Sequence, residues 1–551
     1  MKSWQPLLTG SLAERARQVV DEIAAILAAA PATPTATRQG PDHAADSARA
    51  APTPGEPLAA PESLAAQEPL GASEPLAAVD AALFSPSLAG GTAGVALFFA
   101  YRTAWGGGAG TGASAAGDSA AGDSDAAAVF LDRSTEALAT TPLPPDLYGG
   151  FSGVAWTAEH LYGPRFAAMA TAAAGGPGAG TPERDPLSSA APASSRPAAT
   201  PDIPETPETS ATLATSGTSE TTEDDDEDPL AEIDAGLLRF LDRSPWAADY
   251  DLIRGLAGLG VYALERLPRP SALACLTKIV DRLAETAEHG PQGTTWHTGP
   301  ELLPDWQRKL YPGGYYNLGV AHGVPAVIAM LAAAAAAAGP LGEAGDPAAA
   351  DVARRARSLV EGALRWLLAQ RLPPGAGSWF GTSISPETPA AGSRLAWCYG
   401  DPGIAATLLM TARALGDAAL ETLAVEMALA AAARPPEASG VRDAGLCHGS
   451  AGLAHLFNRM YQETGEPRLA AASRHWFEHA LDFRQPGLGL AGYRAFWMED
   501  DGVTASWRAD PGLLEGVAGI GLAMLGGLSD FEPAWDRLLM LSAATAPPPR
   551  S

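Results

Sequence analysis

The sequence has few cysteines and few basic residues, and each shortage excludes a class of protein. Three cysteines in 551 residues cannot build a disulfide framework, so a reducing, cytoplasmic location is expected. Only 36 lysines and arginines stand against 63 aspartates and glutamates, which gives a formal net charge of −27. So acidic a chain is repelled by nucleic-acid phosphates and by anionic lipids, and we expect neither as a partner.

Long apolar runs are also lacking. The longest, from Val324 to Ala338, is shorter than the roughly 20 residues that a membrane span needs, so no span is predicted. The N-terminus carries Pro6, Gly10 and a charged stretch at residues 14–17 where a signal peptide would have its apolar core. No signal peptide is predicted.

Three stretches contain too few large apolar side chains to form a core, namely residues 31–75, 105–125 and 173–230. We predict that the first is a disordered linker and that the other two are low-complexity inserts. The acidic run 223–228 at the end of the third is interpreted as a solvated tether. The chain then divides into an N-terminal helix over residues 1–30 and one larger domain over residues 76–545.

A repeat runs through this larger domain. A glycine-rich turn followed by an apolar run rich in small residues occurs seven times. The last small residues of the seven turns are Gly94, Gly153, Gly258, Ala326, Gly403, Gly452 and Gly519. Each repeat has room for one helix buried on all sides and one amphipathic helix, and no stretch alternates with the period of a strand. This predicts an all-α fold, an α/α toroid of about seven inner and seven outer helices with all turns at one end.

Two of the three cysteines lie in matching turns of neighbouring repeats, Cys398 in the fifth and Cys447 in the sixth, where His448 follows. Two thiolates and an imidazole suit zinc, and they leave the fourth tetrahedral position open, as in a catalytic site. A free cysteine is often only a small buried apolar residue, which is our interpretation of Cys275. The matched positions favour a metal site for the other two.

Four segments resemble, in order, the signature motifs of the lanthionine synthetase C-like family. They are YDLIRGLAG (250–258), GVAHGVPA (319–326), WCYGDPG (397–403) and CHGSAG (447–452). The resemblance extends from about Leu83 to Leu528 and is closest to the bacterial stand-alone cyclases of lanthipeptide biosynthesis. It implies a zinc ion held by Cys398, Cys447 and His448.

The resemblance also implies a reaction and its partners. A cysteine thiolate of a dehydrated precursor peptide, which carries a leader, would add to a dehydroalanine or dehydrobutyrine and close a lanthionine ring. His322 would protonate the resulting enolate and Asp251 would orient that imidazole. Arg394 would stabilise the enolate oxygen, and Tyr399 would assist proton transfer. A separate dehydratase and an exporter are the protein partners implied.

Two other functions remain open at this point. The same zinc chemistry could add glutathione or another thiol to dehydrated residues of proteins. Alternatively, the toroid could bind peptides without catalysis, which predicts degraded zinc ligands or a missing His322. All of these residues are present in the sequence.

Overall fold

The computed structural model describes residues 4–29, 85–106, 113–173, 228–388, 391–499, 501 and 504–543. The linker predicted at residues 31–75 and almost all of the 173–230 insert lie outside these described residues.

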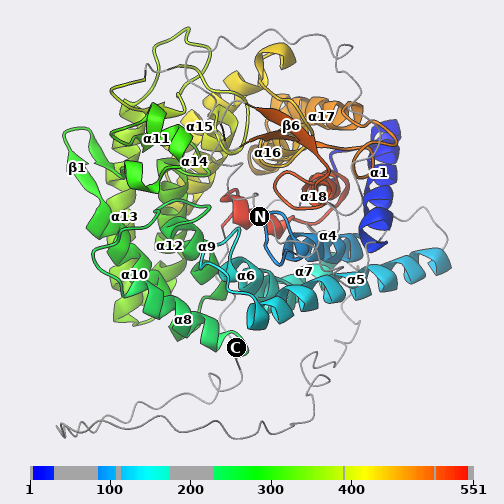
Figure 1. The fold of residues 1–551 in the computed structure, drawn as a ribbon, viewed down its shortest axis with the longest axis horizontal. Coiled ribbons are helices and arrows are strands. Elements are labelled where there is room, and N and C mark those ends of the chain that lie inside the picture. The colour runs from blue at the N-terminus through cyan, green and yellow to red at the C-terminus, as the bar shows by residue number, and fades with distance from the viewer. Residues whose placement is uncertain are drawn as a thin grey trace, which may run out of the picture.

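An inner ring of helices follows the seven turns. Its members are α4 (Thr92–Trp105), α6 (Phe151–Tyr162), α9 (Leu256–Arg266), α12 (Val324–Glu343), α14 (Asp401–Leu415), α16 (Ser450–Thr464) and α18 (Val517–Leu528). Each inner helix packs against the next in this order, and α18 packs against α4, so the ring is closed (Figure 1). The prediction of an all-α toroid is confirmed.

A second set of helices forms the outer layer. They are α1 (Gly10–Ala28), α5 (Ala113–Thr140), α7 (Pro164–Ala173), α8 (Ala231–Leu241), α10 (Pro270–Thr286), α13 (Pro347–Ala369), α15 (Ala418–Ala432) and α17 (Pro467–Asp482). The helix expected over residues 1–30 is α1, and it packs against α18 and α17. Just before it, the backbone N–H groups of Leu7 and Leu8 both donate to Gly527 O at 2.9 Å. α1 is thus the outer partner of the last inner helix.

The interpretation of residues 105–125 as an insert was wrong in part, because α5 begins at Ala113. The segment is rich in alanine, the residue with the highest helix propensity, and α5 packs along α4. Among the contacts that join these helices, Asp123 forms an ion pair with Arg102, and Phe130 stacks on Phe99 with ring centroids 5.7 Å apart.

The end of the acidic run also differs from the expectation. Asp228 forms ion pairs with Arg266 and with Arg269 rather than standing in solvent. Arg266 is fully buried and is also paired with Asp234 at 2.7 Å and with Glu159 at 2.9 Å. Asp228 therefore belongs to a buried ionic network between α6, α8 and α9.

Helix α12 is the one helix of the described residues that is long and apolar enough to cross a membrane. In the protein, 72% of its apolar window is buried. It packs against α9, α13 and α14, so its apolar surface is used for packing between helices of the toroid.

The remaining elements are short. Three two-stranded antiparallel sheets pair β1 (Glu288–Gly290) with β2 (Gly293–Thr295), β3 (Tyr316–Asn317) with β4 (Ser383–Ile384), and β5 (Ala495–Met498) with β6 (Ala505–Arg508). The other short pieces are η2 (Pro300–Leu302), α11 (Asp305–Leu310), η3 (Pro436–Ala438) and η4 (Ala534–Leu539). The strands are incidental to the fold, as the sequence predicts.

A glycine ends six of the seven turns, the fourth ending in Ala326, and this glycine has a steric reason. A Cβ on Gly452 would lie 1.9 Å from Leu446 O, the carbonyl oxygen six residues earlier in the same turn. The equivalent distance is 1.8 Å for both Gly153 and Gly519. The turn therefore folds back on the first residues of its own inner helix, and a side chain at this point would collide with the backbone.

Backbone hydrogen bonds connect neighbouring turns. Ala321 N donates to Cys398 O at 3.3 Å, and Cys398 N donates to Cys447 O at 3.3 Å. Cys447 N then donates to Leu514 O at 2.8 Å, and Leu514 N to Ala89 O at 3.1 Å. These bonds hold the turns side by side at one end of the ring, so residues far apart in sequence share one site.

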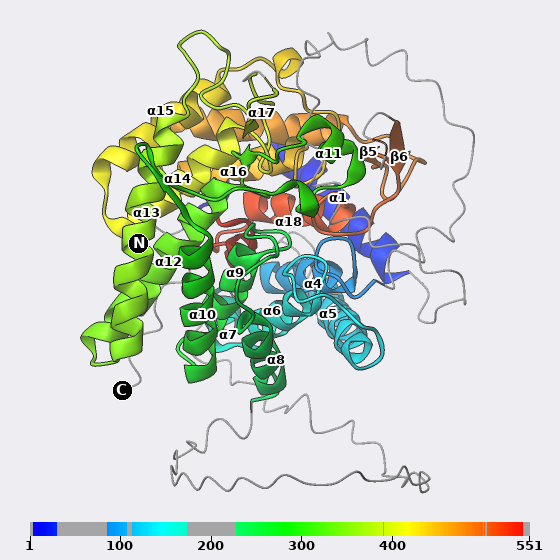
Figure 2. The ribbon, with the colours of Figure 1, turned by 60° about the vertical axis from the view of Figure 1, so that its left-hand side comes forward.

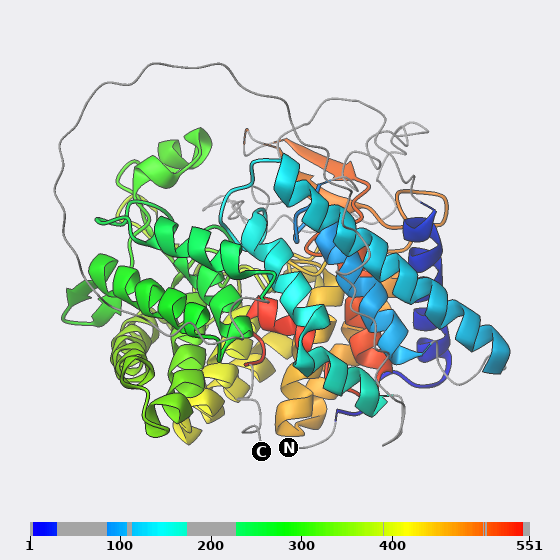
Figure 3. The same ribbon diagram turned by 90° about the horizontal axis from the view of Figure 1, so that it is seen from below.

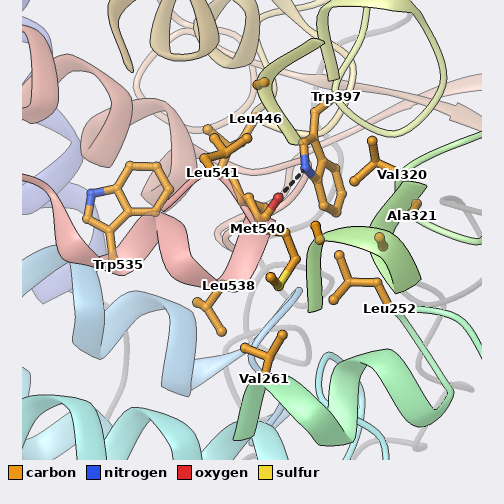
Figure 4. Packing of buried hydrophobic residues seen from close by; sticks show 14 of the residues in the cluster. Leu252, Val261, Val320, Ala321, Trp397, Leu446, Trp535, Leu538, Met540 and Leu541 are labelled. Atoms are coloured by element: carbon orange, nitrogen blue, oxygen red, sulfur yellow. Dashed lines mark hydrogen bonds between the residues drawn. The ribbon is translucent and has the colours of Figure 1, made fainter. Parts of the chain in front are cut away.

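The C-terminal segment, residues 531–543 with η4, fills the middle of the ring (Figure 2, Figure 3). Beneath the turns, Trp397 Nε1 donates to Leu539 O at 2.9 Å, and Met540 and Leu541 pack nearby (Figure 4). Toward the other end of the inner helices, Arg537 Nη2 lies 3.2 Å from Glu265 Oε1. The ring therefore has a packed centre.

Candidate metal centre

The seven turns present one residue each at the same position, directly before the glycine that precedes the inner helix. In chain order these residues are Gly90, Gly149, Arg254, His322, Tyr399, His448 and Glu515. Cys398 and Cys447 come one residue earlier in the fifth and sixth turns. The side chains able to do chemistry are thus concentrated in turns three to seven.

Cys398, Cys447 and His448 meet where the fifth and sixth turns join. Their ligand atoms all lie within 4.8 Å of one another, and all three residues are buried. Two adjacent thiols and an imidazole, shielded from water, form a donor set that zinc prefers.

The cysteine pair is poised to hold negative charge. Burial opposes ionisation, but the hydrogen bond with Cys447 and the charges of Arg394 and His448 hold the pKa of Cys398 well below its usual range. Arg394 Nη2 donates to Cys398 Sγ at 3.3 Å. The hydrogen bond with Cys398 and burial raise the pKa of Cys447 well above its usual value. The pair thus favours one negative charge, on Cys398, and a thiolate is the form in which cysteine binds a metal.

The imidazole of His448 also fits a metal. Its Nδ1 atom is buried and has no hydrogen-bond partner among the described residues. On the other side of the imidazole, His448 Nε2 lies 3.3 Å from Glu515 Oε2 and 3.8 Å from Asp443 Oδ2. A buried imidazole nitrogen without a hydrogen-bond partner costs free energy. A cation bound next to the two thiols would supply that missing partner.

Glu515 is a site residue that the sequence analysis missed. It is buried, and burial raises its pKa to about 8, with the nearby Asp443 and Cys398 adding to the effect against His448. A comparison of the repeats would have found it, because Glu515 holds the same turn position as His322 and His448.

The predicted proton donor, His322, lies in the fourth turn, and its partner Asp251 lies in the third. His322 Nδ1 is 2.5 Å from Asp251 Oδ2, and Asp251 Oδ1 accepts from Arg254 N at 2.7 Å. His322 Nε2 is buried without a hydrogen-bond partner among the described residues. The structure thus brings together the two residues that the sequence predicts to act as a pair, with one ring nitrogen left for a ligand.

Tyr399 lies between the two groups, because it follows Cys398 and its ring centroid is 6.5 Å from that of His322. Asn317 Nδ2 donates to its hydroxyl at 2.9 Å. Burial raises the pKa of Tyr399 well above its usual value, so the phenol keeps its proton. Tyr399 is placed to donate a hydrogen bond within the site.

Cys275 is separate from this cluster, as expected. It is buried on α10, where its thiol contacts Asp234 O at 3.8 Å. Burial raises the pKa of Cys275 to about 12, so it stays a neutral thiol.

Two comparisons with known proteins bear on the family and the fold. The sequence model of a family described as "Lanthionine synthetase C-like protein" matches residues 213–540. Among solved structures, "Nisin cyclase" aligns with a TM-score of 0.51 and 16% sequence identity, over 83% of this chain and 93% of that one. At this identity the structural match shows a shared fold.

Proposed function

This chain belongs to the lanthionine synthetase C-like family, and from that premise we propose that it is a zinc-dependent cyclase. Its substrate is a precursor peptide with a leader, in which serines or threonines have been dehydrated. The reaction is an intramolecular addition of a cysteine thiol to dehydroalanine or dehydrobutyrine, which forms lanthionine or methyllanthionine. Because the substrate arrives dehydrated, a separate dehydratase must act first. We place the enzyme in the cytoplasm, with an exporter acting after it.

The observation that supports this proposal most is the buried set of Cys398, Cys447 and His448. Zinc held by these three residues would keep one position open and would lower the pKa of a substrate thiol there, so that the thiol is a thiolate at neutral pH. Arg394 contacts Cys398 Sγ, so its first task is to balance the charge of the protein's own thiolates. Its Nε has no hydrogen-bond partner among the described residues and is free for the enolate oxygen.

His322 and Asp251 carry the proton in this proposal. When the substrate sulfur bonds to the β-carbon, the C=C electrons move toward the neighbouring carbonyl, and the α-carbon then needs a proton. Asp251 stabilises the protonated imidazole through Nδ1, and the Nε2–H of His322 donates to the α-carbon. The thiol has lost one proton and the α-carbon gains one, so no other reactant is needed.

Metal content tests the site. The purified protein should hold about one zinc per chain, since one three-ligand set is present. Cys398→Ala, Cys447→Ala and His448→Ala should each remove most of it, whereas Cys275→Ala, the matched control, should not. Unchanged zinc in the first three variants would refute the site.

Ring formation tests the reaction. Incubation with a dehydrated peptide should reduce the number of thiols that can be alkylated, as counted by mass spectrometry, without a change in peptide mass before alkylation. An increase in mass in the presence of glutathione, with the peptide's own thiols still free, would instead support addition of an external thiol. Binding of the peptide without either change would support a non-catalytic toroid.

A further inference from the structure

Glu515 has an unusual position for a carboxylate. It is 3% exposed, and none of the described residues donates a hydrogen bond to either of its carboxylate oxygens. Removing a carboxylate from water without replacing those hydrogen bonds is costly. Such a residue weakens the fold that carries it, which points to a role in the site beside it.

The backbone fixes Glu515 next to His448. Leu446 N and Cys447 N both donate to Leu514 O, at 2.9 and 2.8 Å, so the residue after Leu514 must lie against the loop that carries the metal ligands. Gly445 in that loop lets the backbone of Glu515 approach closely, because a Cβ there would lie 3.2 Å from Glu515 O. This places Oε2 3.3 Å from His448 Nε2.

Asp443 also approaches His448, but both of its carboxylate oxygens accept backbone hydrogen bonds. Its Oδ1 accepts from Gly445 N at 3.1 Å and its Oδ2 accepts from Phe496 N at 2.9 Å. Asp443 therefore holds the loop and the β5 strand in place. Glu515 accepts no such bonds, and among the described residues its ion-pair partner is His448, with a carboxylate oxygen of Asp443 also within 4.8 Å.

We propose that Glu515 is a positioning residue of the metal centre: its carboxylate, which lies 3.3 Å from His448 Nε2 here, accepts the Nε2–H hydrogen bond when the metal is bound and so directs Nδ1 of the same imidazole to the metal. The inference rests on the proposed zinc site. A histidine has two ring nitrogens, and an acceptor at one of them fixes which nitrogen binds the metal and how the ring is oriented. The free Nδ1 atom of His448 agrees with this arrangement.

Zinc affinity is the direct test, measured by competition with a chromophoric chelator. Partners of this kind typically contribute about 10- to 100-fold in metal affinity. Glu515→Gln keeps an acceptor but loses the charge, so we expect a loss of about tenfold, near the lower end of that range. Glu515→Leu removes the acceptor as well, and we expect a loss nearer 100-fold.

A matched control is Glu265→Gln. Glu265 is also buried and paired with a histidine, since its Oε1 lies 3.0 Å from His160 Nδ1, but it is near the other end of an inner helix. Zinc affinity in this variant should equal that of the wild type. Wild-type affinity in both Glu515 variants would overturn the inference, whereas a wild-type protein that binds no zinc would overturn the proposed function and the inference with it.

Two further measurements separate positioning from other roles. The cobalt-substituted protein should show the same thiolate-to-metal absorption and coordination number in Glu515→Gln as in the wild type; a changed coordination number would mean that Glu515 is itself a ligand and would overturn the proposal. The metal-free Glu515→Leu protein should melt at the wild-type temperature or above it, because an apolar side chain replaces a buried carboxyl group that accepts no hydrogen bond. A lower melting temperature would indicate a structural role instead.

Discussion

Replacing Glu265 by glutamine should lower stability at neutral pH and flatten its loss in acid. Glu265 joins three parts of the ring, because its carboxylate lies 3.0 Å from His160 Nδ1 of α6 and 3.2 Å from Arg537 Nη2 of the C-terminal segment. Burial opposes ionisation, but Arg537 and His160 outweigh it and lower the pKa of Glu265 to about 2.

The magnitude follows from this shift. The pKa in the folded protein lies below the unfolded value of about 4.5, so the charge stabilises the fold above pH 4.5 and this stability is lost as the pH falls toward 2. At about 1.36 kcal/mol per pKa unit, the contribution is about 3.4 kcal/mol at pH 7 and about 1.4 kcal/mol at pH 3. A folded body of roughly 400 residues has an unfolding entropy of about 0.85 kcal/mol/K, so the variant should melt about 4 °C lower at pH 7.

The assay is a thermal melt of both proteins between pH 7 and pH 3, with Glu478→Gln on the exposed face of α17 as a control that should change nothing. The gap between the wild type and Glu265→Gln should shrink as the pH falls. A gap that stays constant from pH 7 to pH 3, or no gap at all, would refute the assignment of a stabilising, ionised Glu265.

Three other substitutions test the site, the turns and the ionic network. His322→Asn should keep zinc but slow ring closure by about 10²–10⁴-fold, as counted from thiols still open to alkylation; a normal rate would mean that another donor supplies the proton. Gly452→Ala should lower the melting temperature, because its Cβ would lie 1.9 Å from Leu446 O, and an unchanged temperature would show that the turn can shift. Asp228→Asn should cost about 1–3 kcal/mol in chemical denaturation, since the fully buried Arg266 loses one charged partner, and no loss would mean that its other carboxylates suffice.

The ring could be predicted from the sequence because its turns impose a steric rule on particular positions. Gly153, Gly452 and Gly519 recur because a side chain there would strike the carbonyl six residues earlier. Cys398 and Cys447 could also be paired from the sequence, because equivalent positions in adjacent turns must lie side by side.

Other features depend on contacts that no local pattern encodes. Helix α5 begins in a segment of linker-like composition, and its contacts with α4 involve residues further along, such as Asp123 and Phe130. Asp228 belongs to an acidic run, and its burial depends on Arg266 in another repeat. Glu515 is of a residue type common on surfaces, so only its place in the seventh turn distinguishes it. The C-terminal segment has no repeat of its own, so nothing in the periodicity places it inside the ring.

The closure of the ring also has a consequence for synthesis of the chain. Trp4 Nε1 donates to Gly526 O at 3.0 Å across a sequence separation of 522 residues, and α18 packs on both α1 and α4. At about 5–20 residues per second, the ribosome needs roughly half a minute to two minutes to make the intervening chain. During that interval the apolar faces of α1 and α4 lack their partner α18, because that helix has not yet been synthesised. The nascent chain is therefore an expected client of chaperones, and deletion of α18 should yield aggregates rather than a smaller ring.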